Sequence, residues 1–230
     1  MLIGPQNLPA NVRNVREAIQ AALLECGRSV DSVTLLAVSK GQPAESVRAA
    51  AAEGIRDFGE SYLQEALPKL GQLADLDLTW HFIGQLQSNK TRAVAEHFAW
   101  VHGVDRARHA ERLAAQRPYH APPLNVCIQV NVGAEVGKAG VAPGEVAPLA
   151  EAIRALPRLR LRGLMCLPPE EHEVARQRHW FALLRREFAA LVSSGLEIDT
   201  LSMGMSGDFV AAIHEGATIV RIGTALFGPR

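Results

Sequence analysis

The sequence lacks the features that define several classes of protein. Its 230 residues include only three cysteines, Cys26, Cys127 and Cys166, an odd number at wide spacing that fits no disulfide scaffold. No apolar run approaches the ~18 residues that a membrane span needs, and the first residues do not resemble a signal peptide. The 24 basic residues balance the 24 acidic ones, so there is no overall basic field for nucleic acid. We therefore expect a cytoplasmic protein without a nucleic-acid or membrane partner.

Motifs for several kinds of chemistry are also missing. The eight histidines are scattered, with no HxH or HExxH pattern and no cluster with cysteine, so the sequence predicts no metal site. A phosphate-binding GxxxxGK[ST] loop, a dinucleotide-binding GxGxxG fingerprint and a GxSxG nucleophile elbow do not occur. The remaining candidates are single residues whose meaning depends on where the fold places them.

Short apolar runs alternate with helical patterns along the whole chain, in which 48% of the residues are hydrophobic. Several runs are apolar almost throughout, as in strands that are covered on both faces. Such alternation is typical of repeated strand-helix units and a parallel sheet. The predicted strands are residues 33–38, 55–58, 79–83, 99–103, 124–131, 160–166, 197–202 and 218–222.

Helix patterns with recognisable ends fill the intervals. One runs from just after Pro43 to Gly54, and another covers 176–195, with Trp180, Leu184, Phe188 and Leu191 on one stripe. A further helix over 11–27 precedes the first strand, where it could replace the helix missing after the last strand. We predict one domain, residues 1–230, folded as a (β/α)8 TIM barrel with this extra N-terminal helix; an open doubly wound sheet is the alternative.

Residues that follow the strands of such a barrel surround its ligand site. Lys40 is one of only four lysines and follows the first apolar run. Desolvation there would favour the neutral amine, which attacks aldehydes to form a Schiff base. From its position alone, however, a lysine that reaches for solvent is the simpler interpretation.

The last two predicted strands are followed by turns that could hold a phosphate. Gly223 and Thr224 come directly after the last strand, and Ser206 lies in the glycine-containing turn after the strand before it. Backbone N–H groups and hydroxyls at such turns bind phosphates in this architecture, although each turn alone could be only a turn.

Three further residues have two interpretations each. Arg221, inside an apolar strand, needs an acceptor: either an ion pair with Glu60 or Asp105, or a bound cofactor. Met203 could pack on a flat ligand, as could Met205, although core packing is the simpler role. The histidine in the WHFIG segment, His81, is expected to be a buried strand residue with satisfied hydrogen bonds rather than an acid or base.

The chain resembles the YggS/PROSC family of pyridoxal 5'-phosphate (PLP) homeostasis proteins, whose single domain is similar to the barrel of alanine racemase. The resemblance covers about residues 12–229. It depends on the blocks AVSKGQP, DFGESYLQEALPK, WHFIGQLQSNK, NVGAEVGKAGV, RGLMCLP, LSMGMSGD and VRIGTALFG. Two positions depart from the family pattern: Ser61 stands in place of an asparagine, and Gln85 in place of a histidine.

The resemblance implies roles for individual residues. Lys40 would form the Schiff base with PLP, Ser206, Gly223 and Thr224 would hold the phosphate, and Arg221 would face the pyridine nitrogen. Met203 and Met165 would lie beside the ring, and Ser61 would reach the ring oxygen only through water. Lys90 and Lys138 match family lysines; each is either a secondary cofactor contact or a solvated loop residue.

The resemblance implies a monomeric protein that buffers or delivers PLP and so affects amino-acid and keto-acid pools, with transient contact to PLP-dependent apo-enzymes and no substantial turnover. An arginine at the pyridine nitrogen weakens the cofactor as an electron sink. The chain ends soon after the last predicted strand, and neither Tyr62 nor Tyr119 matches the second base of a racemase. The alternatives are a weak PLP-dependent racemase or lyase, or an aldolase that uses Lys40 on a sugar phosphate.

Overall fold

Eight parallel strands close into one barrel in the computed structural model, which describes residues 7–229. Each strand pairs with the next in chain order, and β8 returns to pair with β1, where Leu36 lies opposite Arg221. Because this last pairing closes the sheet, the TIM barrel prediction is confirmed and the open sheet is excluded. The strands are β1 (Thr34–Val38), β2 (Asp57–Glu60), β3 (Thr79–Phe82), β4 (Trp100–Val104), β5 (Leu124–Val130), β6 (Leu159–Cys166), β7 (Thr200–Ser202) and β8 (Ile219–Ile222).

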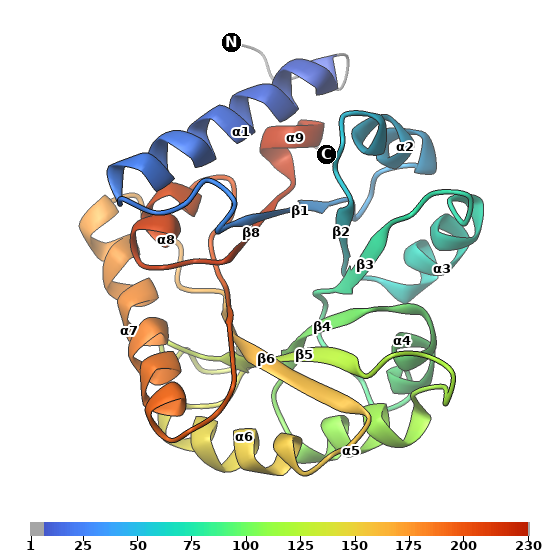
Figure 1. The fold of residues 1–230 in the computed structure, drawn as a ribbon, viewed down its shortest axis with the longest axis vertical. Coiled ribbons are helices and arrows are strands. Elements are labelled where there is room, and N and C mark those ends of the chain that lie inside the picture. The colour runs from blue at the N-terminus through green and yellow to red at the C-terminus, as the bar shows by residue number, and fades with distance from the viewer. Residues whose placement is uncertain (1–6, 230) are drawn as a thin grey trace.

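The helices lie outside the ring of strands, as Figure 1 shows. The N-terminal helix, α1, packs on α8 and α9. Asn11 Nδ2 in α1 donates to the Leu226 carbonyl at 2.9 Å, and Arg28 Nη1, in the turn after α1, donates to the Ile213 carbonyl at 2.9 Å. The helix after β8 has only four residues, so α1 covers this part of the barrel, as predicted. The helices are α1 (Leu8–Glu25), α2 (Ala44–Ala52), α3 (Leu63–Gln72), α4 (Thr91–His97), α5 (Ala107–Gln116), the 3-10 turn η2 (Pro143–Glu145), α6 (Val146–Arg154), α7 (Val174–Ser193), α8 (Phe209–His214) and α9 (Thr224–Phe227).

Strand β2 lies two residues later than predicted. Ile55, which looked like its first residue, belongs to the turn after α2, where its N–H donates to the Ala50 carbonyl at 3.2 Å. Gly54 makes that turn with a φ of 81°. The shift brings Glu60 into the strand and into the barrel interior, where it is fully buried.

The core fills the space between the strands and the helices. On α7, Leu184 and Leu191 are buried as predicted, but Phe181 rather than Trp180 is the large side chain that is fully buried. Trp180 and Phe188 pack partly buried at the margin of the core. The helices thus pack on the strands through one apolar core.

Three structural findings concern membrane spans, metal sites and disulfide bonds, for which the sequence showed no pattern. None of the helices between residues 7 and 229 combines the length and apolarity that a bilayer crossing requires. Over the same residues, no group of three or more histidine, cysteine or acidic side chains is arranged to hold a metal ion. The three cysteines are unpaired, and Cys127 and Cys166 are buried.

Candidate functional site

A cavity of about 270 Å³ lies at the carboxyl ends of the strands, the end at which TIM barrels bind ligands. Its size is close to the lower end of the range for small-molecule sites. All the residues predicted for the cofactor site line it, with the exception of Met203. They are Lys40, Ser61, Met165, Ser206, Arg221, Gly223 and Thr224.

Met203 is a core residue and does not line this cavity. Its N–H donates to the Ile219 carbonyl at 3.1 Å, which continues the pairing of β7 with β8 one residue beyond the strand. Gly204, with a φ of 94°, then turns the chain, and the exposed Met205 lines the cavity instead. The structure therefore puts Met165 and Met205 at the cavity.

Arg221 lines the cavity and is 4% exposed. Nη1 donates to Ser202 Oγ and Nη2 to the Cys166 carbonyl, both at 2.8 Å. Burial lowers the pKa of Arg221 from its usual value, but a guanidinium remains charged in proteins. The expected ion pair is wrong, because Glu60 and Asp105 each pair with a different cation. The buried positive charge is thus held by two neutral oxygens and borders the cavity.

The turns after β7 and β8 meet at one side of the cavity. Ser206 Oγ accepts a hydrogen bond from the Ala225 N–H at 3.3 Å, which joins the first turn to α9. At Gly223, an added Cβ would lie 3.3 Å from the Val38 carbonyl oxygen, so this small residue lets β8 end close to β1. Thr224 is exposed and begins α9. Hydroxyls and backbone groups from two turns therefore offer donors to an anion in one place.

Ser61 lines the cavity next to a close backbone contact. A Cβ added to Gly84 would collide with the Ser61 carbonyl oxygen. Glycine at this position therefore lets the segment after β3 approach the segment after β2. The following residue, Gln85, is exposed and lines a different cavity.

The turn that carries Lys40 is fixed by a buried ion pair that sequence reasoning missed. Glu60 Oε1 accepts hydrogen bonds from Ser39 Oγ and from Lys69 Nζ, both at 2.6 Å. Lys69 Nζ also donates to the Ser39 carbonyl at 2.8 Å. A signal was present in the sequence, because Lys69 follows Ala66 at helical spacing on the buried face of α3. This pair anchors the residue that precedes Lys40.

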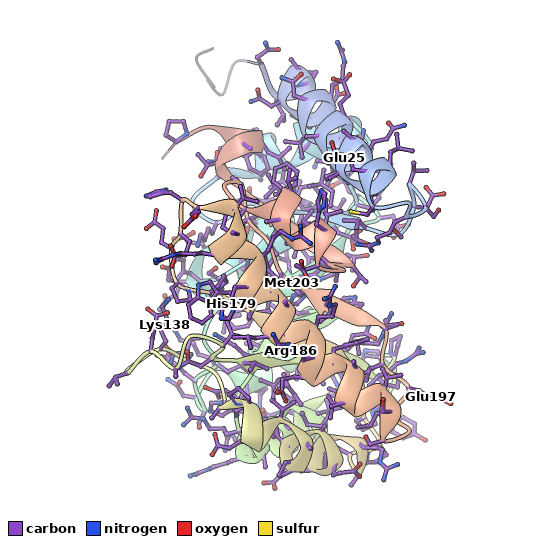
Figure 2. All side chains as sticks on the ribbon, turned by 90° about the vertical axis from the view of Figure 1, so that its left-hand side faces the viewer. Glu25, Lys138, His179, Arg186, Glu197 and Met203 are labelled. Atoms are coloured by element: carbon purple, nitrogen blue, oxygen red, sulfur yellow. The ribbon has the colours of Figure 1, made fainter. Side chains whose placement is uncertain are left out.

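Lys90 and Lys138 do not line the Lys40 cavity. Lys138 is exposed and forms an ion pair with Glu135; Figure 2 shows it on a loop that projects from the barrel. It lines a second, larger cavity of about 750 Å³ together with Gln85 and Arg106. The larger cavity contains none of the residues predicted to hold PLP.

His81 is a buried strand residue with both ring nitrogens hydrogen-bonded, as predicted. Nε2 lies 3.0 Å from Asp57 Oδ1, and Nδ1 lies 3.0 Å from His102 Nε2. His102 Nδ1 in turn lies 2.8 Å from Ser202 Oγ, the oxygen that accepts from Arg221. Sequence reasoning gave no role to His102, because nothing in its local pattern shows that it meets β7 across the barrel.

Comparison with known proteins agrees with this geometry. The sequence profile of the family described as "Alanine racemase, N-terminal domain" matches residues 5–230. The pyridoxal phosphate homeostasis protein of Pseudomonas aeruginosa is 58% identical over 225 residues, which cover 98% of this chain and 95% of that protein. The protein of the same name from Escherichia coli K12 is 51% identical over 223 residues, covering 96% and 95%. The structure of PipY from Synechococcus elongatus, solved with PLP bound, superposes with a TM-score of 0.81 at 40% identity and covers 91% of this chain and 100% of that one.

Proposed function

The chain belongs to the YggS/PROSC family, whose domain is that of the alanine racemase N-terminal barrel, and we propose that it binds PLP reversibly at Lys40 and buffers or delivers the cofactor. The observation that carries this proposal is the meeting of three chemical groups at one cavity. These are the Lys40 amine, the buried Arg221 cation and the polar turn with Ser206, Gly223 and Thr224. The relatives named as PLP homeostasis proteins and the PLP-bound PipY support it.

The side chains fit the parts of PLP one by one. When bound, PLP supplies an aldehyde that condenses with an amine and releases water. Lys40 provides the amine at the cavity, and the hydroxyls of Ser206 and Thr224 with the backbone at Gly223 would hold the phosphate. Met165, which is buried beside the cavity, would limit where a flat ring can lie.

Arg221 argues for storage rather than turnover. A fixed positive charge at the pyridine nitrogen opposes protonation there, and the unprotonated ring withdraws electrons weakly. The two tyrosines, Tyr62 and Tyr119, are exposed and do not line the cavity. A racemase-like exchange of α-protons would therefore lack both a strong electron sink and a tyrosine as second base.

The test is an absorption spectrum of the purified protein after addition of PLP, before and after borohydride reduction. The wild type should show a visible band that reduction removes, with the cofactor then attached to Lys40 in a peptide digest. Lys40→Ala should lose the band, whereas Lys138→Ala, a matched change of an exposed lysine, should keep it. An unchanged band and unchanged attachment in K40A would refute the role of Lys40.

Delivery needs a separate experiment. We propose that a monomer of this protein contacts PLP-dependent apo-enzymes transiently in the cytoplasm, where the three unpaired thiols would stay reduced. Loaded protein should then activate an apo-enzyme faster than its measured rate of PLP release allows. If the apo-enzyme is activated no faster than PLP is released, only free PLP is transferred, and the function would be buffering without direct delivery. Sedimentation analysis tests whether the protein is a monomer in solution.

A further inference from the structure

A continuous row of hydrogen bonds crosses the interior of the barrel and ends at Arg221. It runs from Asp57 at the start of β2 through His81 on β3 and His102 on β4 to Ser202 on β7. Ser202 Oγ then accepts from Arg221 on β8. Strands β4 and β7 are not neighbours in the barrel, so the bond between His102 and Ser202 passes through the core.

With both imidazole rings neutral, the direction of every bond in this row follows from the Asp57 end. An ionised carboxylate only accepts, so His81 Nε2 carries the proton and donates to Asp57. The Nδ1 atom of a neutral His81 is then an acceptor, which requires a proton on His102 Nε2. His102 Nδ1 is left as an acceptor, and the Ser202 hydroxyl donates to it.

The Arg221 end is compatible with the same assignment. A guanidinium only donates, so Ser202 Oγ accepts from Arg221 through one lone pair, and the serine proton stays available for His102 Nδ1. Burial lowers the pKa of His81 and places that of His102 well below its usual value, and the Arg221 charge acts on His102 in the same direction. Both rings are therefore neutral, and the two ends of the row are compatible.

We infer that His81, His102 and Ser202 are positioning residues for Arg221. The row presents an oriented serine oxygen to the guanidinium, and this hydrogen bond fixes the guanidinium before a ligand enters the Lys40 cavity. Arg221 needs such support because its hydrogen-bond partners on the described residues, Ser202 Oγ and the Cys166 carbonyl, are both neutral. The Asp57 carboxylate at the far end orients the dipoles of the row toward the cation.

The packing around the histidines favours this single arrangement. The Trp100 ring stacks on His81 with centroids 5.3 Å apart and an interplanar angle of 11°, which opposes rotation of the imidazole.

Asp57 is partly exposed and lines a cavity of about 510 Å³ that does not include the Lys40 site. Asp208 is another carboxylate that acts on Arg221, and its charge raises the pKa of the guanidinium against the larger effect of burial.

The direct test is the protonation of the two rings in the PLP-free protein, measured by long-range ¹H–¹⁵N correlation NMR between about pH 5 and pH 8. Both histidines should be neutral, with the proton on Nε2, throughout this range. Ser202→Ala should move the ¹⁵N chemical shift of His102 Nδ1 toward that of an imidazole nitrogen that accepts no hydrogen bond. Ser194→Ala, a change of a distant helix-end serine, should move neither histidine. A proton on His102 Nδ1, or titration of either ring like a free histidine, would overturn the inference.

The second arm rests on the proposed function and measures PLP affinity. Loss of a hydrogen bond to a charged group should weaken binding about tenfold in S202A, whereas Ser202→Thr, which keeps the hydroxyl, should restore most of it. Wild-type affinity in S202A would overturn the positioning role. If the wild type takes up no PLP, the proposed function fails, and the NMR result decides on the row of hydrogen bonds by itself.

Discussion

Replacing Lys69 with methionine should destabilise the protein far more than the loss of an exposed lysine does. Lys69 and Glu60 are 6% and 0% exposed, so the substitution leaves a buried carboxylate without its cation. Removing one partner of a buried pair typically costs about 3 to 5 kcal/mol. Glu60 Oε2 already has no hydrogen-bond partner among the described residues, so no spare donor is in place to compensate. For a chain of this size, a loss of 3 kcal/mol lowers Tm by about 6 to 12 °C.

Urea unfolding measures the loss directly, with fluorescence as the probe. Lys138→Met is the matched control, because it removes a lysine from an exposed pair with Glu135 and should cost less than about 1 kcal/mol. Replacing both buried partners, as in Glu60→Leu with Lys69→Met, should recover part of the stability lost in K69M. The buried pair does not act as described if the free energy of unfolding of K69M lies within about 1 kcal/mol of the wild-type value, or if the double variant is no more stable than K69M.

Three further predictions concern separate parts of the molecule. Gly84→Ala should lower both Tm and PLP affinity, because its Cβ collides with the Ser61 carbonyl beside the cavity; a variant that matches the wild type in both assays would contradict this. Burial raises the pKa of the Cys127 and Cys166 thiols to about 12, so thiol reagents near pH 8 should modify these two only after unfolding, as mass spectrometry can show. Burial raises the pKa of Asp199, but hydrogen bonds from its arginine and threonine partners outweigh this, and the net pKa is lowered. The ionised Asp199 stabilises the fold at pH values above the pKa of an unfolded aspartate, about 4, and this effect is lost as pH falls through the folded pKa. Asp199→Asn should therefore destabilise the protein at neutral pH, and the urea midpoints of variant and wild type should converge in acid.

The sequence was most informative where chain order alone determines position. Lys40, Arg221 and Thr224 lie in or directly after strands, and every strand of a closed parallel barrel delivers its carboxyl end to the same face. Finding the strands was therefore enough to predict that these residues meet. Local errors, such as the shift of β2 caused by the buried Ile55, did not affect this conclusion because the order of the strands was unchanged.

The residues that support the site could not be predicted in this way, since their roles depend on which side chains meet across the barrel. Two buried cations, Lys69 and Arg221, border the Lys40 region, and each is stabilised differently. Lys69 has a direct carboxylate partner, Glu60, so it anchors the chain before Lys40 whether or not a ligand is present. Between residues 7 and 229, the direct acceptors of Arg221 are neutral, and a carboxylate lies at the far end of a row of hydrogen bonds. A fully paired guanidinium would gain little from a ligand, whereas one held in place by neutral oxygens keeps its charge effective toward the cavity. The barrel thus combines a buried ion pair that anchors the turn before Lys40 with an oriented cation at the cavity whose direct acceptors are neutral.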